Sequence, residues 1–496
     1  GGDPASPFYV LRPLAPGAAG KGRTAVPVRG VLRILLTGVG ILLAVPVLLA
    51  LFLYGRDAVL GVNRPYVPRE APHPAFPELG QEWRMHPVDN PGDWLPNGLD
   101  GADVNGDGWE DYLTNYEFTG RLRVALHPSG LPADTPWPAI NAGRVPNAEN
   151  AAFGDLDGNG WTDILVAHGV EHTDAPAGIR VLWGGLGPSW RDGGDIPSSL
   201  GLGHWLTVRT ADLDGDGDPD VVAGGRASRT AGGSQRDVDS PSLVWAGIRW
   251  WENPGAEARD LSRWPRHEID PATRSGHGFE FGDVDSDGDP DIVNGNADWD
   301  TPDEEENVVW YENPGPLEVG MPWPVHEVYR GPEFVGKEQA VVADLDGDGR
   351  NDILIPTETA IYWFRQRGGA AEVAFDRVPI PKHPATYWPG RVLEVADLNG
   401  DGRPDLIGAL MHRNGRLPAD RAAVFWMEQA ATGWIPHVIK WGDDFLGLGR
   451  FNGEKWDQFL PRDVDGDGDL DLVANCEEYN RLRAIIAVVW FENPLQ

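Results

Sequence analysis

Residues 211–220 read ADLDGDGDPD, and close variants of this run recur along the chain. The shared pattern is D-x-[DN]-x-[DN]-G-x-x-D, which occurs seven times with starts 52 to 71 residues apart. A segment that repeats in this way is typical of an architecture built from similar units, such as a propeller or a solenoid. The oxygen-bearing side chains of the seven copies are Asp103, Asn105, Asp107 and Asp111; Asp155, Asp157, Asn159 and Asp163; Asp212, Asp214, Asp216 and Asp220; Asp283, Asp285, Asp287 and Asp291; Asp344, Asp346, Asp348 and Asp352; Asp397, Asn399, Asp401 and Asp405; and Asp463, Asp465, Asp467 and Asp471.

The spacing of these side chains predicts a metal site in each copy. Side-chain oxygens at positions 1, 3, 5 and 9, with a backbone carbonyl at position 7, can surround one hard cation, and calcium takes roughly six to eight oxygens in irregular geometry. Magnesium requires a stricter octahedron and fits less well. Position 6 is glycine in every copy, as a sharp turn with positive φ requires. We therefore expect up to seven calcium ions, one per repeat.

Two other interpretations of the loop are weaker. An EF-hand has a similar first half, but it ends in a glutamate and is flanked by helices, whereas here the last aspartate precedes strand-like runs such as Asp220–Ala223. A turn rich in Asp and Asn can also form without metal. Seven copies in register argue against a metal-free turn at most sites, because their 25 aspartates would repel one another without cations.

These loops resemble those of the FG-GAP/VCBS repeat family, which is related to the propeller of integrin α-subunits. The resemblance covers roughly residues 81–496, and the Phe-Gly that precedes the family's loop survives as Phe153-Gly154 and Phe281-Gly282. It implies an all-β fold, a β-propeller with calcium in the first hairpin of each blade, and the seven copies predict seven blades. It does not imply one activity.

Two further elements repeat downstream of the loops. One reads V-x-W-x-E-N-P at its clearest, as in Val488–Pro494, and indicates a strand that runs into a turn. The other is Trp-x-x-His, as at Trp264 to His267, which we interpret as blade packing because it recurs without added acids or cysteines. The seventh repeat lacks its Trp-x-x-His, but Glu82–Val88 carries one. We expect this segment, residues 81–88, to close the last blade, since closure removes exposed sheet edges.

The run Ile34–Gly55 carries no charge and is long enough to cross a bilayer as a helix. It predicts a transmembrane helix over residues 31–55. A buried soluble helix and a cleaved signal peptide are the alternatives, and a signal peptide would have a shorter apolar region. More basic residues precede the run than follow it, which predicts a cytoplasmic N-terminus. We expect an irregular cytoplasmic tail (1–30), the helix, a Pro-rich spacer (56–80) and a propeller (81–496) on the periplasmic or extracellular side of a bacterial-type inner (plasma) membrane.

The composition argues against some classes of partner and cofactor. The formal net charge is −35, with 76 acidic and 41 basic residues, which argues against nucleic acid and favours cations. The single cysteine, Cys476, excludes an intrachain disulfide, so that packing and metal must hold the fold. No phosphate-cradling glycine loop follows a strand, which argues against a nucleotide cofactor.

A second candidate site is predicted from the strand that precedes each loop. The residue six before the loop is polar or charged in six of the seven repeats, and the residue four before it is always apolar. These two positions share one strand face. We therefore expect an apolar belt in the channel and a polar ring nearer its mouth, which is either a solvated rim or a site for a small polar molecule, sugar or peptide. The ring residues are Asn97, Glu149, His277, Glu338, Arg391 and Asp457.

The sequence contains no nucleophile elbow and no paired-histidine zinc motif. The leading hypothesis is therefore a non-catalytic, membrane-anchored interaction or scaffold module that binds a protein or glycan, or an accessory subunit of a larger membrane complex. The alternative is a carbohydrate-active or glycan-binding propeller, because some propellers that resemble this one are sugar lyases or dehydratases. In that case His277, Glu338, Arg391 and Asp457 would supply acid–base groups at the channel mouth.

Overall fold

A computed structural model of the chain describes Leu48 and most of residues 71–495. The gaps within this range are residues 94, 170–175, 230–242, 274–275, 297–306, 317–318, 332–339, 358–359, 370–371, 387–389, 411–420, 443–453 and 479–485. The predicted cytoplasmic tail, the predicted transmembrane helix apart from Leu48, and most of the predicted spacer lie outside the described residues. Within the described part of the chain, no helix is long and apolar enough to cross a membrane.

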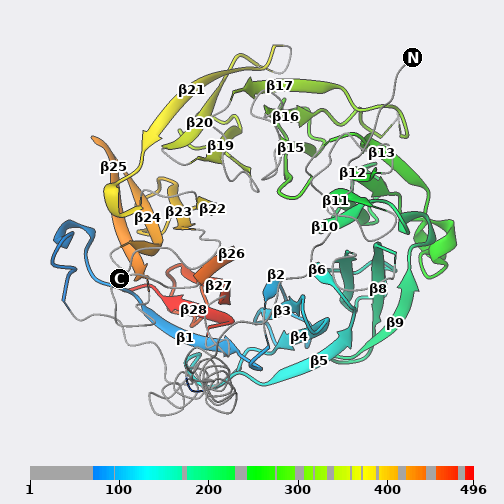
Figure 1. The fold of residues 1–496 in the computed structure, drawn as a ribbon, viewed down its shortest axis with the longest axis horizontal. Coiled ribbons are helices and arrows are strands. Elements are labelled where there is room, and N and C mark those ends of the chain that lie inside the picture. The colour runs from blue at the N-terminus through cyan, green and yellow to red at the C-terminus, as the bar shows by residue number, and fades with distance from the viewer. Residues whose placement is uncertain are drawn as a thin grey trace, which may run out of the picture. The chain divides into compact units, whose positions relative to one another are not determined.

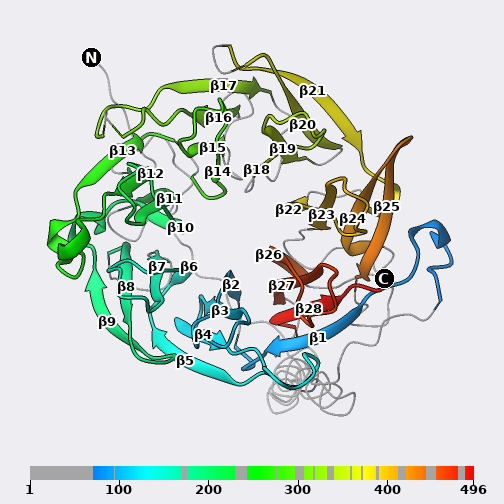
Figure 2. The same ribbon diagram turned by 180° about the vertical axis from the view of Figure 1, so that it is seen from behind.

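Residues 63–496 form one compact unit, in which seven antiparallel sheets of four strands each are arranged around a ring (Figures 1 and 2). The predicted all-β, seven-bladed propeller is therefore confirmed for this unit. From the innermost to the outermost strand, blade 1 is β2 (Pro96–Ala102), β3 (Asp111–Tyr116), β4 (Arg121–Ala125) and β5 (Ala139–Arg144); blade 2 is β6 (Ala148–Gly154), β7 (Asp163–His168), β8 (Gly178–Gly184) and β9 (Trp190–Asp195); blade 3 is β10 (His204–Ala211), β11 (Asp220–Arg229), β12 (Leu243–Trp251) and β13 (Arg266–Asp270); blade 4 is β14 (Glu280–Gly282), β15 (Asp291–Asn296), β16 (Asn307–Tyr311) and β17 (Val325–Arg330); blade 5 is β18 (Val341–Ala343), β19 (Asp352–Pro356), β20 (Ala360–Arg367) and β21 (Ala374–Pro381); blade 6 is β22 (Gly390–Ala396), β23 (Asp405–Leu410), β24 (Ala422–Ala430) and β25 (Gly433–Trp441); and blade 7 is β26 (Glu454–Arg462), β27 (Asp471–Glu478), β28 (Val488–Glu492) and β1 (Arg84–Asp89). Short 3₁₀ turns span Pro77–Leu79, Pro197–Ser199, Gly255–Glu257, Leu261–Arg263 and Pro384–Thr386.

The ring closes between the two ends of the propeller sequence. The first strand, β1, pairs antiparallel with β28, with His86 opposite Trp490 and Arg84 opposite Glu492. The outermost strand of blade 7 therefore comes from the segment around residues 82–88. Its Trp-x-x-His pattern had predicted that this segment closes the last blade. Figure 1 shows β1 in blue beside β28 in red.

Each blade is buried on both faces because it is packed between two neighbours. The second strands are consequently continuous apolar runs rather than alternating ones, and Ile164–Ala167 in β7 is completely buried. The described core divides into seven apolar clusters, and each cluster joins two adjacent blades. We call the interface between two adjacent blades a seam. Tryptophans fill the seams, for example Trp205 and Trp251 in the seam between blades 2 and 3.

Candidate metal centres

The seven aspartate loops lie at equivalent places in the seven blades, between the innermost strand and the next one. In blade 2 the innermost strand ends at Gly154 and the next begins at Asp163. The ninth-position aspartate is the first residue of the second strand in every blade. The repeated sequence pattern is thus the first hairpin turn of each blade, in register around the ring.

The first aspartate of the loop organises the turn. In blade 2, Asp155 Oδ1 accepts the backbone N–H of Asn159 at 3.0 Å, and Oδ2 accepts that of Gly160 at 2.8 Å. Gly160 has φ of +81°, and the sixth-position glycines of all seven loops have φ between +81° and +101°. Glycine adopts this conformation without the steric cost that a Cβ would bring, which explains why position 6 does not vary.

The ninth aspartate fixes the loop to the rest of its blade. Asp220 Oδ2 accepts the N–H of Leu213 in the loop at 2.9 Å, and Oδ1 accepts the N–H of Asn253 beyond the third strand at 2.8 Å. The same two bonds recur in all seven blades. These aspartates are at most 1% exposed.

Burial makes the charge of the ninth aspartate costly. Desolvation, together with the neighbouring loop carboxylates, raises the pKa of Asp220, Asp291 and Asp471 to about 7. The same causes raise the pKa of Asp111, Asp163 and Asp405 to about 6. A bound cation would reverse this effect by favouring the ionised carboxylate.

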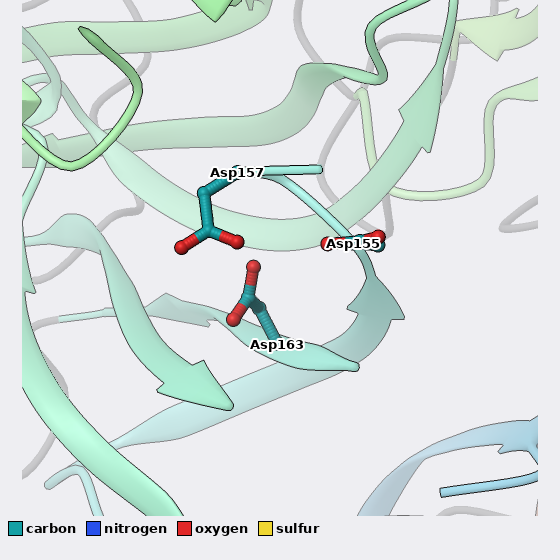
Figure 3. A group of neighbouring side chains, drawn as sticks. All are labelled: Asp155, Asp157 and Asp163. Carbon is teal, nitrogen blue, oxygen red and sulfur yellow. The ribbon is translucent and has the colours of Figure 1, made fainter. Parts of the chain in front are cut away.

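Carboxylates converge in five of the loops. In blade 2, Asp155, Asp157 and Asp163 each offer an oxygen, and these oxygens lie within 4.8 Å of one another (Figure 3). Blades 4 and 7 bring together positions 1, 3 and 9 in the same way, and blades 3 and 5 bring together positions 1, 3 and 5. In blades 1 and 6 the third position is Asn105 or Asn399, which offers an amide oxygen. Oxygen-only ligand sets of this kind suit a hard cation such as calcium.

The loops differ in how much positive charge the chain itself supplies. The seventh position is Arg350 in blade 5 and Arg403 in blade 6, and each guanidinium pairs with the fifth-position aspartate of its own loop. In blades 3, 4 and 7 the seventh position is a further acid. These acids are Asp218, Asp289 and Asp469.

A side chain that hydrogen-bonds to the loops of two neighbouring blades, called the clip residue below, was not predicted from the sequence. The Asn253 side chain donates to the carbonyl of Pro219 in its own loop at 2.9 Å, and to that of Leu156 in the preceding blade's loop at 2.8 Å. Six blades carry such a side chain, the exception being blade 2, where Gly184 stands. The other clip residues are Asn313, Gln366, Gln429, Asn493 and His127. The Glu-Asn-Pro repeat was the available signal, and it was interpreted only as a turn.

The Trp-x-x-His pattern is part of the blade packing. In blade 3 the His267 ring stacks on Trp250 with centroids 4.4 Å apart, and its Nε2 lies 2.9 Å from the Glu252 carboxylate. Blades 4, 6 and 7 repeat this arrangement. The equivalent trios are Trp310, His326 and Glu312; Trp426, His437 and Glu428; and Trp490, His86 and Glu492.

The predicted polar ring is described in part. Glu338 lies outside the described residues, as does the side chain of Arg391. Glu149 Oε1 lies 2.9 Å from His204 Nε2, and Asp457 Oδ1 lies 3.1 Å from Lys455 Nζ. The backbone carbonyl of Asn97 accepts a hydrogen bond from Asn475, and that of His277 accepts one from Thr207.

The expected apolar belt in the channel is wrong. The residues four before each loop are at most 4% exposed and pack in the seven seams between blades, not in the channel. Their strand face points toward the neighbouring blade, because blades stand side by side around the axis. These residues are Leu99, Ala151, Val208, Phe279, Ala340, Leu393 and Phe459.

Comparison with known proteins identifies the repeat. A family model described as an FG-GAP-like repeat matches residues 103–166, 155–223 and 344–408. No curated protein sequence matches the chain. Among solved structures, a lectin from Agrocybe aegerita, described as recognising non-reducing terminal N-acetylglucosamine, is 16% identical, with 81% of this chain and 95% of the lectin covered and a TM-score of 0.47.

Two further solved structures are similar in part. The Photorhabdus luminescens Tc holotoxin pore is 14% identical, with 85% of this chain and 15% of that chain covered and a TM-score of 0.40. The Bacillus licheniformis rhamnogalacturonan lyase is 12% identical, with 81% and 77% covered and a TM-score of 0.35.

Proposed function

The chain is a seven-bladed β-propeller of the FG-GAP repeat family, and from this we propose that it is a calcium-loaded, non-catalytic interaction module. One observation carries the proposal. Seven oxygen-rich loops occupy equivalent hairpins, and in five of them three carboxylates converge within 4.8 Å. Such an arrangement is unfavourable without a cation, because like charges at this distance repel.

Calcium in these loops would stabilise the ring as well as the single turn. The side chains at positions 1, 3, 5 and 9 and the carbonyl at position 7 would hold the ion, and the ion would neutralise the ninth aspartate. That aspartate bonds to the clip residue's backbone N–H, and the clip side chain bonds to the neighbouring loop, as Asn253 does. Ion binding at one loop is thereby linked to the interface with the preceding blade.

A non-catalytic role is supported by the state of two carboxylates of the predicted polar ring, of which Asp457 was also a predicted acid–base group. Glu149 is paired with His204, and Asp457 with Lys455, with all four side chains at most 8% exposed. A carboxylate held in a buried ion pair is poorly placed to reach a substrate. We therefore propose protein or glycan recognition rather than sugar turnover.

The proposed setting is the outer side of a plasma membrane, with the uncharged run Ile34–Gly55 as a single-pass anchor. In this setting the propeller would serve as an accessory subunit of a membrane complex. Extraction of the native protein in mild detergent should recover a stoichiometric partner. A monomer without partners, and released from membranes by salt alone, would contradict both the anchor and the assembly role.

The calcium proposal is tested by chelation. The full chain is purified with calcium, divided, and treated with EDTA or with EDTA followed by excess calcium. We expect the thermal midpoint to fall on chelation and to recover on calcium addition, since a ligand bound only by the folded state stabilises it by mass action. Magnesium at the same concentration is the control and should restore less. An unchanged midpoint would refute calcium binding.

A further inference from the structure

The aspartate loop of blade 5 has arginines of the chain beside two of its carboxylates. Arg350 is the seventh residue of the loop, and its guanidinium donates to Asp348 Oδ2. The backbone N–H of Arg350 donates to the other oxygen, Asp348 Oδ1, at 3.1 Å. Both oxygens of the fifth-position carboxylate therefore already accept a hydrogen bond from within the loop.

The third-position carboxylate of the same loop has a partner in strand β20. Arg365 Nε lies 2.5 Å from Asp346 Oδ2. The Cζ of Arg365 also lies 5.7 Å from the centroid of the Trp363 ring, so that a cation–π contact supports the guanidinium from a second side. The chain thus places two positive charges beside carboxylates that the proposed calcium ion would need.

The ninth-position carboxylate of blade 5 has an additional donor. The Trp363 indole Nε1 donates to Asp352 Oδ2 at 2.8 Å, besides the two backbone N–H groups that bond to this aspartate as in every blade. Among the described residues of the other six blades, no side chain donates to the ninth aspartate. Blade 5 therefore binds this carboxylate more completely than its neighbours do.

Two sequence differences explain the arrangement in blade 5. In blades 3, 4, 6 and 7 the tryptophan equivalent to Trp363 stacks on a histidine of the outermost strand, and a glutamate two residues later pairs with that histidine. In blade 5 the residue opposite Trp363 is Val378, and Arg365 stands in place of the glutamate. The indole and the guanidinium contact the aspartate loop instead.

The turn of the blade 5 loop is also complete without an ion. Asp344 Oδ1 accepts the backbone N–H of Asp348 at 3.0 Å, and Oδ2 accepts that of Gly349 at 2.8 Å. With the contacts described above, each of the four loop carboxylates has a partner within the chain.

Blades 3 and 4 have the opposite balance of charge. Each of their loops has five aspartates, because the seventh position is Asp218 or Asp289. Within the described part of the chain, the loops whose aspartates pair with an arginine are those of blades 2, 5 and 6. Five aspartates give the blade 4 loop a formal charge of −5, whereas four aspartates with Arg350 and Arg365 give the blade 5 loop −2. Calcium affinity depends on the charge of the ligand set, so the loops should differ in affinity.

We propose that Arg350, Arg365 and Trp363 hold the blade 5 loop in its folded form without calcium, and that this loop is the weakest calcium site of the seven. The inference rests on the proposed calcium binding and adds which loop depends on it least. An ion can enter blade 5 only if the guanidiniums leave the carboxylates or if it stays beside their positive charge. Either course lowers the affinity.

The test is a series of anomalous difference maps from crystals of the full chain, equilibrated at increasing concentrations of free calcium. We expect the peak at blade 5 to appear at about 10-fold higher calcium than the peaks at blades 3 and 4, since each of two partly exposed arginine pairs changes affinity about 3- to 5-fold. Arg350→Gln and Arg365→Gln should each bring the blade 5 peak about 3- to 5-fold closer to the others.

Arg367→Gln is the matched control for Arg365→Gln. It removes the same charge from the same strand, but Arg367 pairs with Asp376 at 2.7 Å rather than with a loop aspartate. It should leave the blade 5 peak where it is. Thermal midpoints in EDTA give a second measurement that needs no bound ion. Arg365→Gln should lower the midpoint in EDTA more than Arg367→Gln does, because the ion-free loop loses one of its own cations.

Three results would overturn the inference. The blade 5 peak could appear together with those of blades 3 and 4, Arg365→Gln and Arg367→Gln could shift it equally, or the two variants could have equal midpoints in EDTA. In each case calcium would still be seen in the other loops, and the proposed calcium binding would stand. Maps without a peak at any loop, even at the highest calcium concentration, would refute the calcium proposal itself.

Discussion

Replacing Asn493 with alanine is expected to destabilise the folded propeller by about 2–4 kcal/mol. The Asn493 side chain is buried and donates to the carbonyls of Leu398 and Leu470, both at 2.9 Å. Alanine leaves both carbonyls without this donor, and each lost buried bond costs about 1–2 kcal/mol. The backbone N–H of residue 493 still bonds to Asp471, so the ninth aspartate keeps its contact.

The assay is denaturant unfolding of the full chain in calcium, followed by tryptophan fluorescence and circular dichroism. Asn141→Ala is the control, because Asn141 is exposed and its side chain, among the described residues, accepts one hydrogen bond, from Arg123 at 3.2 Å. This substitution should change the free energy of unfolding by no more than about 0.5 kcal/mol. Asn493→Gln should recover part of the loss, since Gln429 makes the same clip in blade 6. Equal stability of Asn493→Ala and Asn141→Ala would show that the clip does not hold the seam.

Three further predictions concern the metal and the ring. Asp214→Ala removes the third-position oxygen, so it should lower the calcium stoichiometry by one and reduce the thermal midpoint more in calcium than in EDTA; an unchanged metal content by elemental analysis would contradict it. Burial raises the pKa of Asp220, Asp291 and Asp471 from 3.8 to about 7. Protonation of these carboxyls therefore stabilises the ion-free fold fully below about pH 4, and this stabilisation is lost as the pH rises through 7. We expect EDTA to lower the thermal midpoint more at pH 8 than at pH 5. Equal EDTA effects at both pH values would refute that linkage. Deleting residues 81–89 removes β1 and exposes the edge of β28, so the truncated chain should associate in gel filtration; a stable monomer would show that closure by β1 is dispensable.

The number of blades and the positions of the loops could be predicted because both depend on short-range sequence patterns. The spacing from Asp155 to Asp163 fixes a turn within nine residues, and the run after Asp163 has the composition of a strand buried on both faces. The partner of β28 was also accessible, because Glu82–Val88 carries the pattern that the last blade lacked.

The clip and the channel could not be predicted in the same way. Asn493 and its acceptor Leu398 are 95 positions apart, and nothing in the local pattern says which carbonyl the carboxamide reaches. For residues such as Phe279, strand alternation predicted a shared face but not what that face packs against. Adjacent blades pack closely, which is a property of the tertiary structure. As a result, residues that were expected to line the channel lie instead in the core between two blades.

The proposed calcium sites are tested most directly by an anomalous difference map from crystals of the full chain grown in calcium. We expect a peak between Asp155, Asp157 and Asp163, and at the equivalent point of the other carboxylate-rich loops, with oxygens at about 2.3–2.6 Å. Loops that show no peak in such crystals would contradict the proposal that the propeller holds calcium.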